Sequence, residues 1–356
     1  MKRFALLAIA ILGLSLSAAA QDDKGYIFTN NNEVKTVPIT NQFRSGTCWC
    51  FSTLSFLEEE IMRAGGEQMT LSQMWVVRHA YFEKAVKYVR LHGHLNLAVG
   101  GAAHDVTEVI KNKNGKLTTA WMNGLNAILD AYFGELPTTF EYKGKEYTPK
   151  SFAESLPIDI NDYVEITSYT HYPFYTTFAL EVPDNWMWEK MYNIPIEELM
   201  AIVDAALADN RPVAWAADVS EKGFKGNKGI GIVPEDTENI VIGSDAEKWG
   251  KLSASEKEAQ IYAMNEIVKE KAITQEMRQE AYDRYQTTDD HGMVIVGTAT
   301  TPDGTKFYHV QNSWGESGPY KGFYYFSRPY VEYKTMDIMV NKNIIPKDIQ
   351  KKMGLK

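Results

Sequence analysis

The chain has 356 residues, 44% of them hydrophobic, and its formal net charge is −9 at pH 7. A chain of this length and composition can bury one large core or two packed ones. Its acidic balance and lack of a basic run are a poor match for the phosphates of nucleic acid or for an anionic membrane surface, so neither partner is predicted. Cys48 and Cys50 are too close together to form a disulfide framework, because residues two apart on a helix point in different directions.

The first twenty residues have the pattern of a secretory signal peptide. Residues 1–3 are basic, an apolar run covers 4–16, and small residues at 17–20 offer a cleavage point near Ala20. The apolar run is short for a membrane span, although an uncleaved anchor is the alternative interpretation. Cleavage would remove Lys2 and Arg3 and take the charge from −9 to −11. The mature protein is therefore expected to be exported, either periplasmic or secreted, with no membrane contact.

Residues 21–161 have the pattern of a mainly helical lobe. An extended lead-in comes first, with a short strand predicted at 37–39. Apolar side chains recur at helical spacing over 48–64, and two glycines at 65–66 end that helix. Further helices are predicted over about 73–91, 105–111 and 119–133.

From residue 162 to residue 340 the pattern is that of a β-rich lobe. Alternating or apolar runs predict strands at 163–167, 178–182, 212–217, 293–297, 306–310 and 322–326, with one amphipathic helix at 195–208. Residues 244–284 are charged and free of proline, which predicts a helical insertion. Residues 341–356 form a C-terminal tail. The expected fold class is therefore α+β, a helical lobe followed by a β-rich one.

Four residues together match the needs of a cysteine nucleophile. Cys48 lies where a glycine-containing loop meets a predicted helix, and a helix N-terminus favours the thiolate. A nucleophilic cysteine also needs a base, a group that orients the base, and a donor for the oxyanion. His291, Asn312 and Gln42 are the candidates for those three roles, in that order.

The neighbours of these residues suggest how the site is tuned. The imidazole of His291 is expected to lower the pKa of Cys48, so that the pair rests as thiolate and imidazolium. Trp314 is placed to shield the His291–Asn312 hydrogen bond from water. Asp289 and Asp290, just before the histidine, form either a solvated turn or groups that tune the imidazole or a substrate amine.

Other chemistry-bearing residues are assigned no role. Cys50 is expected to be a buried free thiol. His92, His94 and His104 lack two further ligands at a recognisable spacing, so no metal and no cofactor is predicted.

The arrangement resembles the papain-like cysteine peptidases. The Gly-x-Cys-Trp of that family stands at 46–49, Gln42 lies six residues before the cysteine, and Asn-Ser-Trp-Gly stands at 312–315. The resemblance implies a two-lobe fold with a helical N-terminal lobe and an antiparallel, β-barrel-like C-terminal lobe. It also implies hydrolysis of peptides through an acyl-enzyme on the cysteine.

Two departures from papain point to one branch of the family. Ser45 replaces the first cysteine of the signature, and His291 follows Cys48 by 243 residues, against roughly 130 in papain itself. Both features are similar to the bleomycin hydrolase and aminopeptidase C branch, and the likeness covers most of the mature chain. By this resemblance Gly100 and Gly101 would pair with the substrate backbone.

The branch also suggests a role for the tail. Its C-terminal arm lies in the cleft, where the terminal carboxylate meets the α-amine of the substrate and makes the enzyme an aminopeptidase. Here Lys356 would supply that carboxylate and Trp314 would line the substrate site. An endopeptidase with an open cleft and a catalytically silent peptide-binding homologue are the alternatives. A homo-oligomer is compatible with the resemblance, since the branch commonly forms rings.

Overall fold

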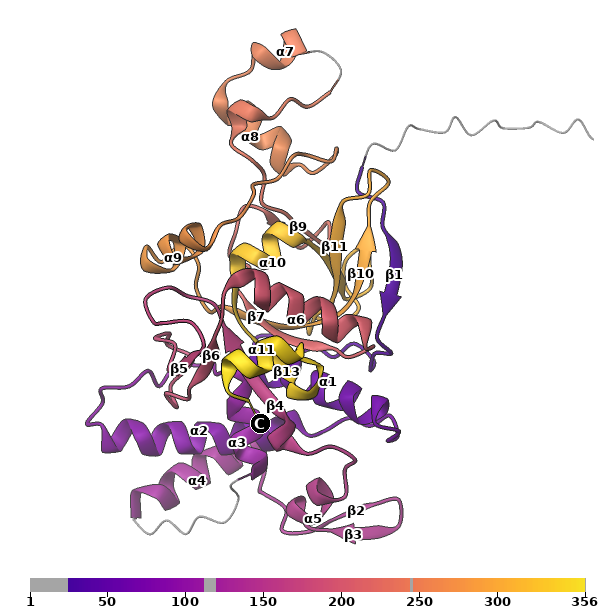
Figure 1. The fold of residues 1–356 in the computed structure, drawn as a ribbon. Helices are drawn as coiled ribbons and strands as arrows, with labels where there is room; N and C mark the ends of the chain where they lie inside the picture. The colour runs from indigo at the N-terminus through magenta and orange to yellow at the C-terminus, as the bar shows by residue number, and fades with distance from the viewer. Residues whose placement is uncertain (1–24, 112–119, 244–245, 356) are drawn as a thin grey trace, which may run out of the picture.

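The computed structural model describes residues 25–111, 120–243 and 246–355 (Figure 1). The expected signal peptide and Lys356 lie outside these residues. Helices dominate the first part, at the lower end of Figure 1, where a small hairpin and one short helix follow them. These elements are α1 (Cys48–Arg63), α2 (Gln73–Arg90), α3 (Ala103–Lys111), α4 (Ala120–Phe133), β2 (Phe140–Tyr142), β3 (Lys145–Tyr147) and α5 (Pro149–Glu154).

One large sheet dominates the rest of the molecule. Its strand order is β5-β6-β4-β13-β7-β10-β11-β12-β9-β8, and β1 pairs with β10 beside this path. Most neighbours are antiparallel, whereas β4–β6 and β9–β12 are parallel. The strands are β1 (Thr29–Glu33), β4 (Tyr163–Thr167), β5 (Thr176–Phe178), β6 (Met191–Asn193), β7 (Val213–Ala217), β8 (Phe224–Lys225), β9 (Ile230–Gly231), β10 (His291–Thr300), β11 (Lys306–Gln311), β12 (Phe323–Ser327) and β13 (Thr335–Asn341). The α+β class is confirmed, although the described strands form an open path rather than a closed barrel.

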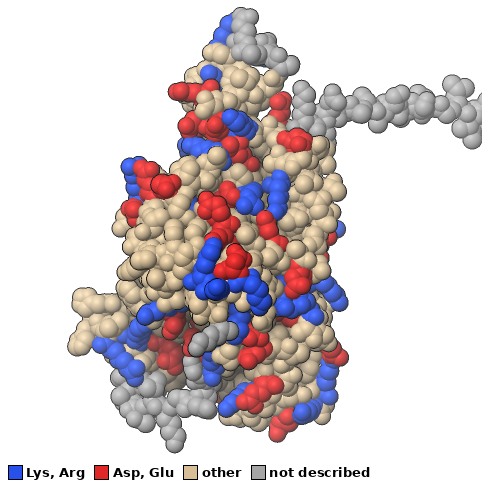
Figure 2. Space-filling model, in the orientation of Figure 1, with Lys and Arg blue, Asp and Glu red and all other residues tan. Residues whose placement is uncertain are grey.

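The remaining helices surround this sheet. In Figure 1, α6 and α11 lie in front of it, and α7 and α8 project at the top. Basic and acidic side chains are interspersed on the same face of the molecule (Figure 2). These helices are α6 (Ile196–Ala208), α7 (Ala246–Gly250), α8 (Ala254–Tyr262), α9 (Gln275–Asp283), α10 (Arg328–Lys334) and α11 (Lys347–Met353), with 3₁₀ turns η1 (Ile160–Asp162), η2 (Thr237–Asn239) and η3 (Lys342–Ile344). No helix in the described ranges is long and apolar enough to cross a membrane.

Three predicted elements differ from the structure. The strand predicted at 178–182 lies at Thr176–Phe178 instead, and residues 179–182 are irregular. The strand predicted at 37–39 is wrong: these residues are irregular, Val37 is buried, and Pro38 has no N–H for a ladder. The first strand, β1, lies earlier, on β10. The helical insertion predicted at 244–284 contains, in its described part, the three short helices α7, α8 and α9, separated by irregular segments. Between α8 and α9 the chain instead pairs with an upstream loop, where Pro234 bridges Glu270.

Helix α1 lies in the centre of the main hydrophobic cluster and determines where the site forms. Leu54, Phe56 and Leu57 are almost fully buried, and α1 packs against β10 and β7. Burial on this scale, at about 25 cal/mol per Å² of apolar surface, fixes the helix against the sheet. Its first residue, Cys48, is thereby held beside the first residue of β10, His291.

Candidate active site

Cys48 begins α1 after a turn that requires glycine. Gly46 has φ +63°, and a Cβ there would lie 2.7 Å from Val99 Cγ2, so any side chain would clash. The thiol of Cys48 is partly accessible, whereas Cys50 is fully buried as expected, with its Sγ 3.5 Å from the carbonyl oxygen of Gln73. Only the first of the two cysteines therefore faces a pocket.

His291 and Cys48 line the same small pocket. The strand β10 approaches α1 so closely that a Cβ on Gly292 would lie 3.4 Å from the backbone carbon and oxygen of Cys48, and 2.6 Å from Ser52 Oγ. Because Gly292 has no side chain, β10 can approach the first turn of α1 closely, which brings His291 next to Cys48. The predicted nucleophile and base come together across 243 residues of chain.

Asn312 orients the imidazole. Its Oδ1 accepts a hydrogen bond from the Ser313 N–H at 2.7 Å and lies 2.8 Å from His291 Nε2. Because Oδ1 is an acceptor, Nε2 carries a proton, and Nδ1 is the nitrogen free to act as a base. The Trp314 ring stacks on the imidazole, with centroids 4.6 Å apart and planes at 28°, as the predicted shield requires.

Gln42 is held by the same loop. Its Oε1 accepts from the Ser313 hydroxyl at 2.7 Å, and its backbone N–H donates to the Ser313 carbonyl at 2.9 Å. Gly315 N–H also donates to Thr40 O at 2.9 Å, so the two segments lie side by side. Within the described ranges no residue accepts a hydrogen bond from the Gln42 amide NH₂. This group is therefore left free to donate to a ligand.

Burial favours the neutral form of both reacting groups. Desolvation raises the pKa of the Cys48 thiol, and the backbone N–H groups of Gly292 and Trp49 only partly offset it. Desolvation likewise lowers the pKa of His291. The expected resting pair of thiolate and imidazolium is thus not the form that burial favours. The negative charges of Asp184 and Asp290 oppose the thiolate further.

The two glycines of the predicted backbone contact lie at the rim of this site. Gly101 lines the pocket with Cys48. Gly100 has φ +103°, and a Cβ there would lie 2.2 Å from Asp184 Oδ1. Lys84 donates to the carbonyl of Gly100 at 3.2 Å and to that of Ala98 at 2.9 Å, which holds the loop in place.

Three acidic residues, Asp184, Asp289 and Asp337, line the pocket as well. Asp289 is one of the two acids that the sequence analysis considered for a tuning role, whereas Asp184 and Asp337 were not selected. The sequence could have indicated Asp337, because it is the only charged residue in the apolar stretch 336–340 of β13. Asp184 lies in an irregular loop and offered no such indication.

The three histidines considered for a metal are separated. His92 and His94 are exposed, whereas His104 is buried with its Nδ1 2.7 Å from Glu165 Oε2. Burial alone would lower the pKa of His104, but Glu165 and Asp105 raise it to about 9, so the imidazole is charged and paired. No group of three or more metal-binding side chains occurs among the residues that the structure describes.

The C-terminal tail packs on the core. Ile345, Ile349 and Met353 are buried in the main cluster, and Lys352 Nζ lies 2.5 Å from Glu198 Oε1. No tail residue up to position 355 lines the pocket at Cys48. Lys356 itself lies outside the described residues, and its role stays a prediction.

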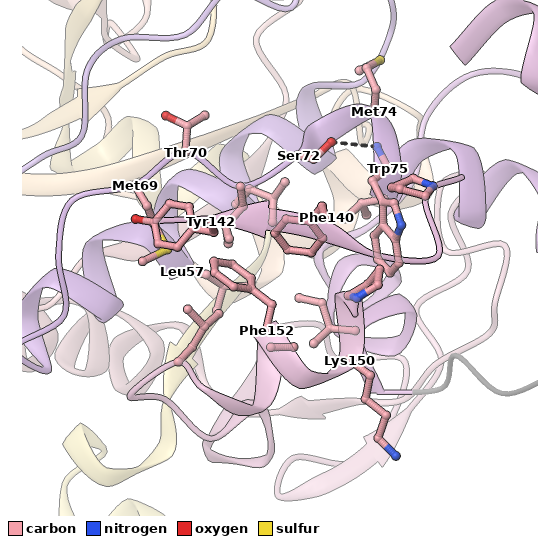
Figure 3. A pocket seen from close by; sticks show the side chains of 18 of the residues that line it. Leu57, Met69, Thr70, Ser72, Met74, Trp75, Phe140, Tyr142, Lys150 and Phe152 are labelled. Carbon is pink, nitrogen blue, oxygen red and sulfur yellow. Dashed lines mark hydrogen bonds between the residues drawn. The ribbon is translucent and has the colours of Figure 1, made fainter. Parts of the chain in front are cut away.

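A larger apolar pocket of about 1200 Å³ lies elsewhere on α1. Figure 3 shows Leu57 of α1, Trp75 of α2, and Phe140 and Phe152 from the hairpin region around it. Neither a cysteine nor a histidine is among its described lining residues. The reactive groups are therefore at the smaller pocket.

The fold and the placement of Cys48 beside His291 define a cysteine peptidase of the papain-like class. The chain belongs to the Peptidase C1-like family, whose model matches residues 5–92 and 229–355, more than half of the chain.

Similar proteins and a similar solved structure support the assignment to this family. Aminopeptidase G of Lactobacillus delbrueckii subsp. lactis is 21% identical over 401 aligned positions, which cover 90% of this chain and 84% of that protein. Aminopeptidase C of Lactobacillus helveticus is 32% identical over 62 residues, 17% of this chain and 14% of that protein. The crystal structure of PepW from Lactobacillus rhamnosis HN001 (DR20) has a TM-score of 0.65 at 18% identity, covering 92% of this chain and 84% of that one. The predicted likeness to the bleomycin hydrolase and aminopeptidase C branch is confirmed.

Proposed function

We propose that this peptidase is an exported aminopeptidase that uses Cys48 as nucleophile and His291 as general base. The observation that carries the proposal is the 2.8 Å contact between His291 Nε2 and Asn312 Oδ1, which leaves Nδ1 free at a pocket shared with Cys48. A thiol nucleophile needs a base within reach for its activation, and a free Nδ1 at the shared pocket supports that role.

The chemistry follows from these contacts. As the Cys48 sulfur attacks the scissile carbonyl, His291 Nδ1 accepts the thiol proton. The Gln42 NH₂ and the Cys48 backbone N–H stabilise the oxyanion. His291 then gives the proton to the leaving amine. Water, deprotonated by the same nitrogen, hydrolyses the thioester and restores the thiol.

Two further parts of the proposal come from other observations. The relatives named aminopeptidase G, C and E support release of single residues from a peptide N-terminus. The pattern of residues 1–20 supports export, with cleavage near Ala20. N-terminal sequencing of protein from the cell envelope and the medium tests this. Recovery of the intact N-terminus in the cytoplasm alone would reject it.

One observation favours a second candidate, an endopeptidase. None of the tail residues that the structure describes, up to Leu355, lines the pocket at Cys48. An endopeptidase would accept peptides with blocked N-termini.

One comparison separates the candidates. A leucyl-coumarin amide and its N-acetyl twin are assayed with the wild type and with Cys48→Ala. The aminopeptidase proposal expects faster cleavage of the free-amine substrate, with both activities lost in C48A. Faster cleavage of the acetylated substrate rejects it in favour of the endopeptidase. No cleavage, together with no labelling by a thiol-directed epoxide, identifies a silent homologue.

A further inference from the structure

Three carboxylate side chains line the small pocket beside Cys48. Asp184 and Asp289 are half-buried and Asp337 is 5% exposed, and all three line the pocket. No lysine or arginine is among the described residues that line it. Three acids thus face a cavity next to the nucleophile without a lining cation to balance them.

Asp337 has no partner within the described part of the chain. Neither a hydrogen bond nor an ion pair joins its carboxylate to another described residue. It lies on β13 opposite Ala216 of β7, which also lines the pocket. Burial, with the charges of Glu165 and Asp289 adding to it, raises the pKa of Asp337 well above its usual range, and the paired His104 offsets this only in part. Burying a carboxylate without a donor is costly, so this group calls for a ligand that carries positive charge or donates hydrogen bonds.

Asp184 and Asp289 form a connected pair at the side of the pocket. The Asp184 N–H donates to Asp289 Oδ2 at 2.9 Å, and the Asp184 carboxylate lies against Gly100. Burial, with neighbouring carboxylates adding to it, raises the pKa of Asp184 to about 7 and that of Asp289 to about 6. The nearest buried cation, Lys84, uses its Nζ on the carbonyl oxygens of residues 98 and 100.

We propose that Asp184, Asp289 and Asp337 form the subsite that binds the α-ammonium group of the substrate. The inference rests on the proposed aminopeptidase function and names the part of the chain that recognises the free N-terminus. The pocket volume is about 40 Å³. A cavity of that volume has room for a group the size of a water molecule, and an ammonium group is of that size.

Covalent geometry agrees with this placement. In a peptide cleaved after its first residue, the α-nitrogen is only two bonds from the scissile carbonyl carbon, about 2.5 Å away. A pocket that adjoins Cys48 is therefore within reach of that nitrogen. An acetylated N-terminus would bring no charge and a bulky group, so the same acids also reject blocked peptides.

The test uses substrates that differ in where the ammonium stands. Leucyl-coumarin amide carries it at the α-position, the des-amino 4-methylpentanoyl amide lacks it, and N-acetyl-lysyl-leucyl-coumarin amide carries it only on a side chain. The variants are Asp184→Asn, Asp289→Asn and Asp337→Asn. Asp290→Asn is the matched control, because its carboxylate accepts from the N–H groups of Val219 and Ser220 and does not line the pocket.

We expect D184N and D289N to lower kcat/KM for the free-amine substrate by roughly 10- to 100-fold, because each removes a hydrogen bond to a charged group. Cleavage of the des-amino substrate should change by no more than about 2-fold, since it lacks that bond. The control D290N should leave the ratio of the two rates unchanged. Thermal melting verifies that each variant is folded. If D337N does not fold, the two half-buried positions still decide the question.

The outcomes separate this inference from the proposed function. Equal loss for the free-amine and des-amino substrates would overturn the subsite, even while the wild type prefers free amines. If D184N slows cleavage of the lysyl substrate alone, the pocket binds a basic side chain of the substrate. That result would also overturn the α-ammonium subsite. A wild type that prefers the acetylated leucyl substrate refutes the aminopeptidase function itself.

Discussion

Ser313 donates its hydroxyl proton to Gln42 Oε1 at 2.7 Å, across 271 positions of the chain. The backbone N–H of the same serine donates to Asn312 Oδ1, which in turn binds His291. One residue therefore orients both the proposed oxyanion donor and the group that holds the base. The two halves of the site are rigid with respect to each other because a single loop fixes them.

This relationship predicts a graded loss of activity at the oxyanion side. Gln42→Ala should lower kcat by roughly 100- to 1000-fold, the usual cost of removing an oxyanion donor. Ser313→Ala keeps that donor but frees its amide to rotate, so we expect a smaller loss, about 10-fold. Steady-state kinetics on the leucyl reporter measure both, with KM nearly constant. A larger loss in S313A than in Q42A would contradict the assigned roles.

The two cysteines offer a matched pair of variants. Cys48→Ala should abolish hydrolysis and epoxide labelling, because it removes the only thiol that lines the pocket. Cys50→Ala should keep kcat/KM and lose about 1 kcal/mol of stability, since its sulfur fills a buried site. Intact-protein mass spectrometry and thermal melting measure the two effects. Labelling of C48A by the epoxide would show that Cys48 is not the nucleophile.

Much of the fold was predictable because burial patterns repeat at fixed periods. The helices that begin near 48, 73 and 196, and the strands at 163–167 and 306–311, agree with the pattern to within a few residues. The strand predicted at 37–39 was wrong because an apolar proline segment resembles a strand but cannot join a ladder. The polar stretch 29–33 pairs with β10 instead, through tertiary contact that no local pattern carries.

The grouping of the candidate site residues was predictable from the motif. In the structure Cys48 and His291 share a pocket, His291 contacts Asn312, and Gln42 contacts Ser313, whereas their catalytic roles stay a prediction. Asp184 and Asp337 were not found, because they enter the pocket from a loop and a distant strand that only the folded sheet brings together. The direction in which burial shifts the pKa of Cys48 was also not predictable, since it depends on how deeply the folded chain buries the thiol.

Burial of Glu58 within α1 predicts a dependence of stability on pH. The side chain is 1% exposed and accepts one hydrogen bond, from the Leu71 N–H at 2.6 Å, and burial raises its pKa to about 7. The native state therefore holds this proton more tightly than the unfolded state does. The contribution of protonated Glu58 to the unfolding free energy is therefore complete below pH ~4.5 and is lost as the pH rises through about 7. The unfolding free energy at the two ends of this range differs by about 3 kcal/mol from this group.

The variant Glu58→Gln isolates this contribution. The amide keeps the acceptor for Leu71 but carries no charge, so its unfolding free energy should fall less than that of the wild type between pH 4.5 and 7. Glu141→Gln, at an exposed position of β2, is the control. Chemical denaturation at several pH values measures the difference. If the unfolding free energies of E58Q and the wild type change with pH in the same way, Glu58 is not the source of the pH dependence.

The packing of α11 predicts that its fully buried residues stabilise the fold more than the partly buried Leu355 that follows it. Ile349 is 3% exposed in the main cluster, so Ile349→Ala should lower the unfolding free energy by about 2–5 kcal/mol. Deleting Leu355 and Lys356 leaves the Ile349 contact intact and removes the partly buried packing of Leu355 and its N–H bond to the Gln350 carbonyl, so the melting temperature should fall less than in I349A. Because the carboxylates at Asp184 and Asp289 already provide an anionic site beside Cys48, the truncated enzyme should keep its preference for free-amine substrates. A truncated enzyme that remains folded but cleaves acetylated and free substrates equally well would assign amine recognition to the terminal carboxylate instead.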